Sequence, residues 1–384
     1  MLRLGVDAGC WTNRRGYGRF TRGIITALAT REDVQLTLIA DRPTARALTL
    51  PPRAQLLEAP ATTAASEAAS ASGHRPWRDL LACSLTASRA RFDVFFFPSV
   101  YTYFPLFSRT PQVVALHDAI PEQLPDLVFP NWRRRLFWAL KVRWALRAAR
   151  RVVTVSPFAA TEVRQRLGVS ARRLRVLSEA PDPVFFPRPP EQVRLTCQRY
   201  RLGCPYLLYV GGFSPHKDLR TLLRAFYRLL REQPTLHLAL AGDFSGDRFY
   251  TEPLAVRALQ DALGIAERVH WLGYVPDEDL AALYSGAVAL VLPSLGEGFG
   301  LPVVEAAACG CPVVASDRSH AADVIAATRV FPAKDDVALA ATLRPFLEPA
   351  VRQAVGAQAQ QEASRFQWSA VAAAAMAVFR EVSP

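Results

Sequence analysis

Short runs of β-branched and aromatic residues alternate with longer stretches of helical periodicity along the chain. In the first half we expect strands at residues 2–6, 34–40, 93–97, 113–116, 151–155 and 174–177. In the second half we expect them at 206–210, 236–241, 269–272, 287–292 and 312–315. Strands separated by helices are typical of βαβ units, which build parallel sheets. The pattern therefore predicts an α/β fold in which each half of the chain forms an open, doubly wound sheet.

A proline-rich stretch at residues 181–190 separates the two halves, and such sequence continues neither a helix nor a central strand. A chain of 384 residues is also too long for one ordinary hydrophobic core. We therefore expect an N-terminal domain at 1–185, a C-terminal domain at 190–365 and a helix at 366–384 that packs back on the N-terminal domain. Residues 59–75, rich in Ala, Ser and Thr, are expected to form a mobile loop.

The net charge of +12 implies an anionic partner, which is nucleic acid, a phosphate-bearing substrate or an anionic membrane surface. The six cysteines form no CxxC pairs and no histidine stands at metal-ligand spacing, so neither a metal site nor a disulfide framework is expected. No stretch reaches the ~20 apolar residues that a bilayer span requires. These features favour a cytoplasmic protein with reduced thiols.

The densest motif follows the expected strand at 287–292. It is a turn made of Glu297, Gly298, Phe299, Gly300 and Leu301, and the helix after it carries Glu305. Ligands bind at this end of the strands in open α/β sheets, and glycines let backbone amides approach a ligand closely. The free amides of a helix N-terminus suit a diphosphate. We expect Glu297 and Glu305 to reach opposite ends of a nucleotide sugar; the alternative is a helix-terminal charge and a solvated surface charge.

A second motif opens the second half of the chain as a strand, a Gly-Gly turn and a helix. Its candidate ligand-binding residues are Gly211, Gly212, Ser214, His216 and Lys217. The Lys217 ammonium group is expected to reach a diphosphate held by the loop amides and to stabilise the charge of a departing group. An ordinary surface lysine is the alternative interpretation.

These motifs resemble those of GT-B glycosyltransferases of the large retaining family four, also described as the glycosyltransferase group 1 superfamily. The resemblance covers almost the whole chain, and its most specific part is the pair Glu297 and Glu305, separated by seven residues. It implies two Rossmann-like domains facing an interdomain cleft. It also implies that Glu297 lies beside the donor sugar, that Glu305 holds the ribose and that Lys217 binds the diphosphate.

The resemblance assigns further residues to the site. The nucleobase would pack on the turn that contains Tyr274 and Val275. A glycine-rich loop that approaches the donor phosphate and the acceptor would comprise Gly16, Tyr17, Gly18 and Arg19. His117 stands where the family places a histidine near the donor sugar, with Asp118 on the acceptor side; the alternative is a histidine with a structural role only.

The chain departs from many relatives in its diphosphate loop. Many relatives carry arginine at the position of His216, and some carry another at the position of Gly212. Phosphate neutralisation in this chain would therefore rest on Lys217 and helix dipoles, with help from Arg19.

Residues 131–151 contain eight basic and no acidic residues, interleaved with Trp132, Trp138 and Trp144. A basic helix with interfacial tryptophans suits an anionic membrane, which would place the protein on the inner face of the cytoplasmic membrane. The alternative, compatible with the first on a different face, is a helix that covers the sheet through Leu136, Leu140 and Trp144. Nucleic acid is not expected as a partner, because no recognised nucleic-acid motif accompanies the arginines.

The expected reaction is transfer of a glycosyl group from a nucleoside diphosphate sugar to an acceptor hydroxyl. By resemblance, the reaction retains the anomeric configuration and needs neither a cofactor nor a bound metal. The two donor motifs resemble those of bacterial polysaccharide mannosyltransferases, which favours GDP-mannose and a glycan or lipid-linked saccharide acceptor. UDP-glucose is the alternative donor. A phosphorylase-like or sucrose-forming activity, and a non-catalytic subunit that binds a nucleotide sugar or a membrane, are the alternative functions.

Overall fold

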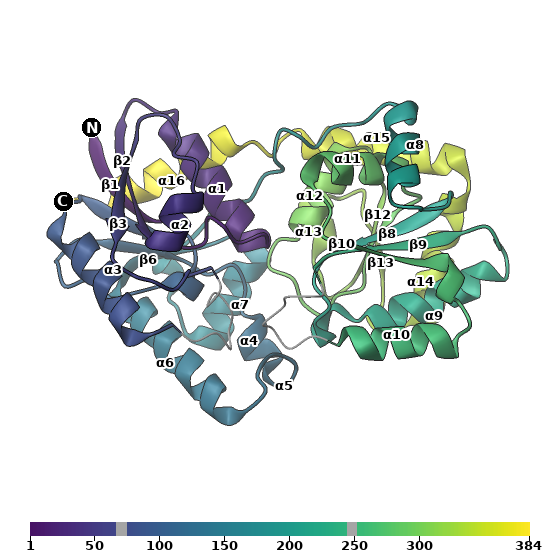
Figure 1. Cartoon of the computed structure of the whole chain (residues 1–384), viewed down its shortest axis with the longest axis horizontal. Helices are drawn as coiled ribbons and strands as arrows, with labels where there is room; N and C mark the ends of the chain where they lie inside the picture. Colours follow the sequence, from purple (N-terminus) through teal and green to yellow (C-terminus); the bar gives the residue numbers. More distant parts are fainter. Residues whose placement is uncertain (67–74, 244–251) are drawn as a thin grey trace. The chain divides into compact units, whose positions relative to one another are not determined.

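The computed structural model describes residues 1–66, 75–243 and 252–384 (Figure 1). These fall into two compact units: unit 1 contains Met1–Ala180 with Gln367–Pro384, and unit 2 contains Pro181–Phe366. The first boundary lies before the proline-rich stretch because that stretch packs on unit 2. Phe185 contacts Tyr284 at a ring distance of 5.9 Å, and the Arg188 amide donates to Ser285 Oγ at 2.9 Å.

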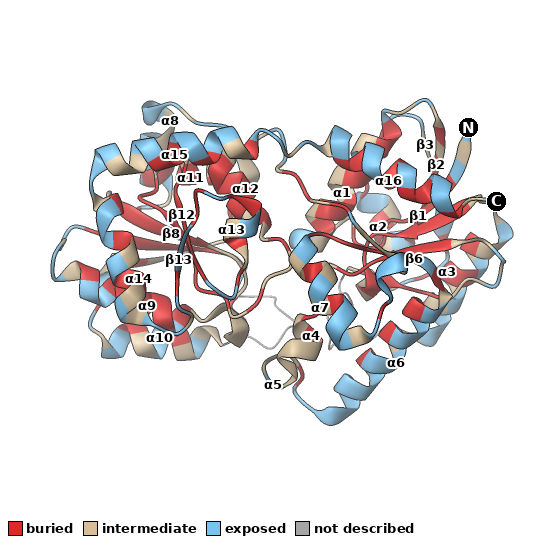
Figure 2. Ribbon diagram, turned by 180° about the vertical axis from the view of Figure 1, so that it is seen from behind, coloured by how far each residue is buried: buried red, intermediate tan, exposed pale blue. Residues whose placement is uncertain are grey.

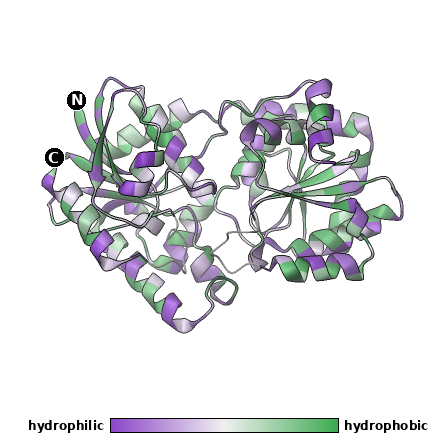
Figure 3. Cartoon of the chain, viewed as in Figure 1, coloured by the Kyte–Doolittle hydropathy of each residue, from purple (hydrophilic) through white to green (hydrophobic). Residues whose placement is uncertain are grey.

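Unit 1 is built on a parallel seven-stranded sheet with the order β3-β2-β1-β4-β5-β6-β7 (Figure 1). The strands are β1 (Leu2–Asp7), β2 (Val34–Asp41), β3 (Ala54–Ala59), β4 (Val94–Phe97), β5 (Gln112–Ala115), β6 (Ala149–Thr154) and β7 (Leu174–Val176). Strands in the middle of this sheet are buried on both faces, as their continuous apolar sequences require (Figures 2 and 3).

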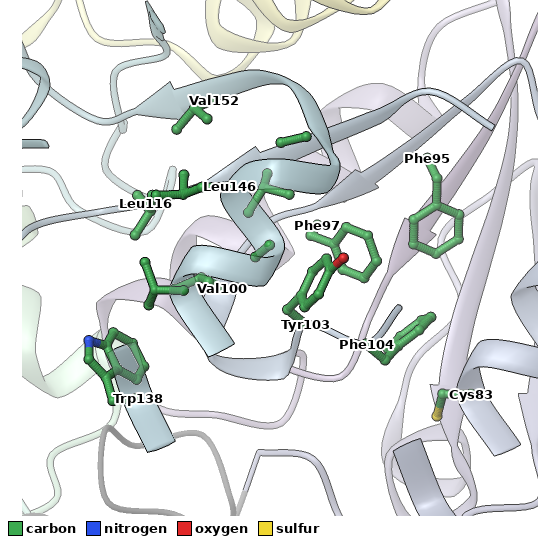
Figure 4. Packing of buried hydrophobic residues seen from close by; sticks show 14 of the residues in the cluster. Cys83, Phe95, Phe97, Val100, Tyr103, Phe104, Leu116, Trp138, Leu146 and Val152 are labelled. Carbon is green, nitrogen blue, oxygen red and sulfur yellow. The ribbon is translucent and has the colours of Figure 1, made fainter. Parts of the chain in front are cut away.

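The helices of unit 1 cover the two faces of this sheet. α3 (Trp77–Arg89), α6 (Trp132–Ala148) and α7 (Pro157–Leu167) share one apolar cluster with β4 and β5. In that cluster Phe97 lies 4.8 Å from Tyr103 and 5.1 Å from Phe104, measured between ring centroids (Figure 4). The other helices are α1 (Gly16–Ala29), α2 (Arg42–Ala47), α4 (Ile120–Gln123), α5 (Pro125–Val128) and α16 (Trp368–Val382).

The C-terminal helix α16 packs on unit 1. Its Trp368 ring lies 6.0 Å from Phe20 of α1, and Phe379 lies 5.2 Å from Phe96 of β4. Glu381 accepts hydrogen bonds from Arg151 and Arg175, which extend from β6 and β7. α16 is therefore an integral layer of unit 1, although more than 180 residues of unit 2 precede it in the chain.

Unit 2 is built on a parallel six-stranded sheet with the order β10-β9-β8-β11-β12-β13. The strands are β8 (Tyr206–Val210), β9 (His237–Ala241), β10 (Val269–Gly273), β11 (Leu290–Leu292), β12 (Val313–Ser316) and β13 (Arg329–Phe331). The helices are α8 (Pro190–Arg199), α9 (Leu219–Leu230), α10 (Pro253–Ala262), α11 (Asp277–Gly286), α12 (Leu301–Ala308), α13 (Ala321–Val324), α14 (Asp336–Leu343) and α15 (Pro349–Ala363).

The structure adds to the expected strands and moves the start of two of them by more than one residue. β11 begins at Leu290 and not at residue 287. The edge strands β3 and β13 are not among those expected from the sequence. β6 begins at Ala149, not at residue 151, so the basic helix α6 ends at Ala148. The mobile loop expected at 59–75 falls partly outside the described residues, at 67–74. Its described part is held in place, because the Thr63 amide donates to Asp79 and the Ala65 amide to Asp41, both at 2.9 Å.

Candidate active site

The strand order of unit 2 reverses between β8 and β11. Loops at such a switch point diverge from the carboxyl ends of two neighbouring strands, which is where ligands bind in open α/β sheets. The loop after β8 runs over residues 211–218 and the loop after β11 over 293–300. A hydrogen bond from the Leu295 amide to the His216 carbonyl, at 2.7 Å, joins the two loops. The fold therefore brings the two motifs of the second half together.

Lys217 and Glu297 form an ion pair between these loops. Lys217 Nζ lies 2.6 Å from Glu297 Oε1, and the side chains are only 19% and 14% exposed. Ser294 Oγ donates to the same carboxylate oxygen at 2.7 Å. Burial raises the pKa of Glu297, but the charge of Lys217 and the hydrogen bonds from Lys217 and Ser294 outweigh burial and hold the pKa below 4.5. Glu297 is therefore a carboxylate at neutral pH, fixed in place and able to accept hydrogen bonds from hydroxyl groups.

The turn after Glu297 presents backbone and not side chains. Phe299 and Leu301 are buried, and Phe299 packs on Phe366 at 5.8 Å. Gly300 precedes the first turn of α12 in a left-handed conformation with φ +81°. α12 therefore begins three residues after Gly298. Pro302 has no amide proton and the Val303 amide donates to the Gly300 carbonyl at 2.7 Å, so it is the partial positive charge of the helix end that suits an anion.

The Gly-Gly turn is fixed by contacts between the strand ends. The Gly211 amide donates to the Ala241 carbonyl at 3.0 Å, and Tyr209 Oη donates to the Gly212 carbonyl at 2.5 Å. Gly242, which the sequence analysis missed, lies against Gly211: a Cβ on Gly242 would stand 1.9 Å from the Gly211 carbonyl oxygen. Lys217 lies in a 3-10 turn, Pro215–Lys217. It does not lie in the first turn of the helix that follows the motif, because α9 begins at Leu219. Ser214, just before that turn, is buried.

Glu305 is not a solvated surface charge. Its residue is 2% exposed, and Tyr284 Oη of α11 donates to Glu305 Oε2 at 3.1 Å. A buried carboxylate with a phenol partner is pre-oriented, which suits recognition of hydroxyl groups. In the turn after β10, Tyr274 is exposed whereas Val275 is buried, so only the Tyr274 ring is accessible to a planar ligand.

In unit 1, Gly16 to Arg19 form the first turn of α1 and not a loop. The loop lies before them, at residues 8–15, and it is held by Arg22, whose guanidinium donates to the carbonyls of Trp11 and Asn13 at 2.6 and 2.7 Å. Gly18 sits against this loop, because a Cβ there would lie 2.0 Å from the Asn13 carbonyl oxygen. The Asn13 side chain also donates to Tyr17 Oη at 3.3 Å.

Both ring nitrogens of His117 have partners inside unit 1. Nδ1 lies 3.1 Å from Glu179 Oε1 and Nε2 lies 2.8 Å from the Pro98 carbonyl oxygen, while the edge of Phe20 packs on the ring at 4.8 Å. Burial lowers the pKa of His117, but the hydrogen bond and the charge of Glu179 outweigh burial, so the pKa lies above 6.5. The geometry fits an imidazolium that donates to two acceptors. Contact with a donor sugar stays a prediction for His117. Glu179, 62 positions away in sequence, was missed.

Asp118 accepts a hydrogen bond from a nearby backbone amide: its Oδ1 lies 3.0 Å from the Ile120 amide nitrogen.

The switch point of unit 1, between β1 and β4, contains a pair of polar residues that were not among those predicted from the sequence. Thr102 Oγ1 donates to Asp7 Oδ2 at 2.6 Å, and burial raises the pKa of Asp7 to about 6. An aspartate at the carboxyl end of a predicted strand was the signal that could have revealed this pair.

Three further features of the described residues bear on function. They contain no group of three or more His, Cys, Asp or Glu side chains placed to hold a metal ion. The six cysteines are all free thiols. Within the described ranges, no helix has both the length and the apolar sequence needed to span a bilayer.

Comparison with known proteins bears on the family of the chain. Residues 200–362 match the family described as Glycosyl transferases group 1, and residues 14–183 match Glycosyltransferase Family 4. The chain is 33% identical to O-antigen chain mannosyltransferase B of Escherichia coli over 228 residues, 58% of each protein. It is 31% identical over 248 residues to D-inositol 3-phosphate glycosyltransferase of Acidothermus cellulolyticus, covering 61% of this chain and 54% of that protein. The chain thus spans little more than half the length of the curated relatives it matches.

Solved structures share the fold. Sucrose-phosphate synthase (tll1590) from Thermosynechococcus elongatus aligns with a TM-score of 0.78 at 19% identity, covering 100% of this chain and 99% of that one. Alr3699/HepE of Anabaena, in complex with UDP and glucose, aligns with a TM-score of 0.74 at 20% identity, covering 99% of both chains. The prediction of an α/β, GT-B fold with two Rossmann-like parallel sheets is confirmed. The two family matches lie one on each sheet, and the chain belongs to the glycosyltransferase group 1 superfamily, family four, of GT-B glycosyltransferases.

Proposed function

We propose that the protein is a glycosyltransferase that moves a sugar from a nucleoside diphosphate sugar to a saccharide acceptor. The observation that carries the proposal is the buried ion pair of Lys217 and Glu297 at the switch point of unit 2, next to the N-terminus of α12. A cation, the positive end of a helix and a fixed carboxylate are together suited to bind a diphosphate joined to a sugar.

Each group has a distinct role in the proposed reaction. The Lys217 ammonium and the positive end of α12 stabilise the negative charge that grows on the diphosphate as its bond to the sugar breaks. The Glu297 carboxylate accepts hydrogen bonds from sugar hydroxyls and holds the reacting carbon in place. Glu305, oriented by Tyr284, binds the ribose hydroxyls. The proposal includes retention of anomeric configuration. It also includes independence of bound metal, which is tested by adding a chelator to the assay.

We propose GDP-mannose as the donor and a glycan or lipid-linked saccharide as the acceptor. Support comes from a relative named as an O-antigen chain mannosyltransferase, 33% identical to this chain. UDP-glucose is the second candidate, because a protein of the same fold has been solved with UDP and glucose. On the acceptor side we place Tyr17, Arg19 and Asp118 of unit 1.

Nucleotide binding is the first test. Thermal unfolding of the purified protein is measured with UDP, GDP, ADP, TDP and CMP, since a ligand at 100 times its Kd stabilises the native state by about 2.7 kcal/mol. A selective shift with GDP supports a mannosyl donor, and a selective shift with UDP moves the assignment to glucose-type sugars. If none of the nucleotides raises the unfolding temperature, the donor-site assignment is wrong.

Turnover is the second test. Glu297→Gln and Lys217→Gln are each expected to lower the transfer rate by about 100-fold with the fold intact. Glu232→Gln, which breaks an exposed ion pair with Arg344 in the same unit, is the matched control and should transfer at the normal rate. Nucleotide binding without any turnover would indicate a non-catalytic subunit, and a rate that requires inorganic phosphate would indicate a phosphorylase.

A further inference from the structure

The basic helix α6 has two apolar faces, and only one of them is covered. The covered face consists of Trp138, Val142, Ala145 and Leu146, which join the core cluster of unit 1 (Figure 4). This corrects the sequence interpretation in which Leu136, Leu140 and Trp144 cover the sheet. The sequence could not decide between the two faces, because both are apolar.

The outer face of α6 exposes large apolar side chains. The exposed fractions are 69% for Trp132, 51% for Leu136, 53% for Phe137, 58% for Leu140 and 59% for Trp144. At roughly 100° per residue these five positions cover an arc of about 140°, opposite the covered face. Exposed apolar surface of this extent marks an interaction site more often than a simple solvated face.

Arginines lie within the same arc. Arg133, Arg143 and Arg147 are exposed and fall between the apolar positions around the helix, and α6 contains no acidic residue. Lys141 does not belong to this outer surface, because its Nζ donates to the Tyr101 carbonyl at 2.5 Å and lies 6.0 Å from the buried Trp138 ring. Burial lowers the pKa of Lys141 to about 8. The outer surface of α6 is therefore formed by arginines, tryptophans and leucines.

A second helix on the same face of the sheet repeats this arrangement. α3 packs into the same core cluster as α6, and it exposes Trp77, Leu81 and Leu85 at intervals of four residues. The single acidic residue of α3, Asp79, is buried and accepts hydrogen bonds from the amides of residues 62 and 63. Neither helix exposes a negative charge on this face of unit 1.

We propose that the outer faces of α6 and α3 bind the surface of an anionic phospholipid bilayer. Tryptophan rings and leucines would enter the headgroup region while the arginines pair with lipid phosphates, which is the arrangement of an interfacial helix. Charge complementarity favours a lipid surface over a protein partner, because the arginines are interleaved with the apolar residues and do not form a rim around them. The proposal is independent of sugar transfer, so either can fail alone.

Co-sedimentation of the full chain with vesicles tests the proposal. The protein is expected to sediment with phosphatidylcholine vesicles that contain phosphatidylglycerol and to remain in solution with phosphatidylcholine alone, and binding should weaken as salt is raised. Arg143→Gln combined with Arg147→Gln should weaken binding about 25-fold, since each arginine near the surface contributes about 1 kcal/mol, or about fivefold. Trp132→Ala combined with Trp144→Ala should weaken it about tenfold or more through lost apolar contact.

Arg228→Gln combined with Arg344→Gln is the matched control, because it removes the same charge from exposed side chains of unit 2. Equal losses in the control and the α6 arginine variant would overturn the proposal in favour of unspecific charge attraction. Unchanged binding in the tryptophan variant would also overturn it. The native chain could instead fail to bind vesicles and self-associate in analytical ultracentrifugation. If the tryptophan substitutions abolish that self-association, the outer face of α6 binds a second copy of the chain and the proposal is wrong. Transfer to a soluble acceptor should stay normal in these variants, which separates lipid binding from catalysis.

Discussion

Lys217 and Glu297 stabilise each other as ions only while both are present. Removal of one partner leaves the other charge largely buried and uncompensated, which costs about 3–5 kcal/mol for a fully buried pair. Here the side chains keep 19% and 14% exposure, so we expect a loss of about 2 kcal/mol in the free energy of unfolding for Lys217→Met at pH 7. The double variant Lys217→Met with Glu297→Gln should regain part of this loss. Urea unfolding of the four proteins measures the coupling.

The same pair sets a pH dependence of stability. The pKa of Glu297 is lower in the folded state than its ordinary value of 4.5, so its contribution is complete above that value. It is lost as the pH falls through the folded-state pKa. The difference between the native chain and Glu297→Gln should therefore shrink below pH ~4.5. A constant difference down to strongly acidic pH would contradict the ion pair.

The stabilisation from His117 depends on pH in the opposite direction to that from Glu297. Its pKa is raised above 6.5 in the folded state, so the stabilisation from the His117–Glu179 pair is complete below 6.5 and is lost as the pH rises through the folded-state pKa. We expect His117→Gln to be less stable than the native chain at pH 6 and to approach it at high pH. Thermal unfolding between pH 5.5 and 9 provides the measurement, with Glu179→Gln expected to follow the same curve. A histidine that titrates at or below 6.5 by NMR would show that the pair does not form.

At the scale of single residues, local spacing was informative and long-range partners were not. Glu297, Lys217 and the glycines stand out because their motifs are contiguous. Ser294 and Glu179 did not, because a hydroxyl or carboxyl partner is identified only by the fold that brings it near. The burial of Glu305 was likewise hidden, since it depends on Tyr284 of another helix.

At the scale of elements, the first turn of α1 packs closely against the backbone of the preceding loop. A Cβ at position 18 would stand 2.0 Å from the Asn13 carbonyl oxygen and 2.7 Å from its carbonyl carbon, and these backbone atoms cannot move aside as the end of a flexible side chain could. Gly18→Ala is therefore expected to displace the loop at 8–15 and destabilise unit 1 by about 1–3 kcal/mol. Hydrogen exchange of the amides at 9–22 should rise.

Gly168→Ala is a useful comparison for this experiment. Gly168 caps the C-terminus of α7 with φ +66°, and no atom lies within 4 Å of a Cβ added there. The loss of stability in Gly168→Ala is therefore due to backbone strain alone. If both substitutions raise exchange only around their own helix ends by similar amounts, the close contact at Gly18 is not responsible for the effect.

Strand prediction succeeded in the sheet interiors and missed two of the four edge strands, β3 and β13, whereas strands were expected at the other two edges, β7 and β10. Central strands such as β4, with the sequence VFFF, are apolar throughout because both faces are covered. The strands that the sequence did not reveal, β3 and β13, pair on one side only and have mostly accessible residues, so their hydrophobic signal is weak. The orientation of α6 could not be predicted for a different reason. The helix has two apolar faces, so its sequence does not show which of them packs on the core.

At the scale of the whole molecule, unit 1 depends on residues from distant parts of the chain. α16 buries Val371, Met376 and Phe379 on unit 1, and Arg380 pairs with Asp33. Truncation after Phe366 is therefore expected to destabilise unit 1 severely and to leave unit 2 folded. Differential scanning calorimetry should show the transition of unit 1 shifted down by more than 10 °C or lost, consistent with several kcal/mol of lost burial. Truncation after Val382 is the control, because Ser383 and Pro384 lie beyond α16. Retention of the native unit 1 transition in the shorter chain would show that α16 is dispensable.

The dependence of unit 1 on α16 also imposes an order on biosynthesis. Translation adds ~5–20 residues per second, and unit 2 supplies residues 181–366 between the seven strands and α16. For roughly 10 to 40 s, the nascent sheet therefore stands with the surface around Phe20 and Phe96 uncovered, while unit 2 emerges from the ribosome as one continuous segment. The unit that is synthesised first is therefore the one that completes its fold last.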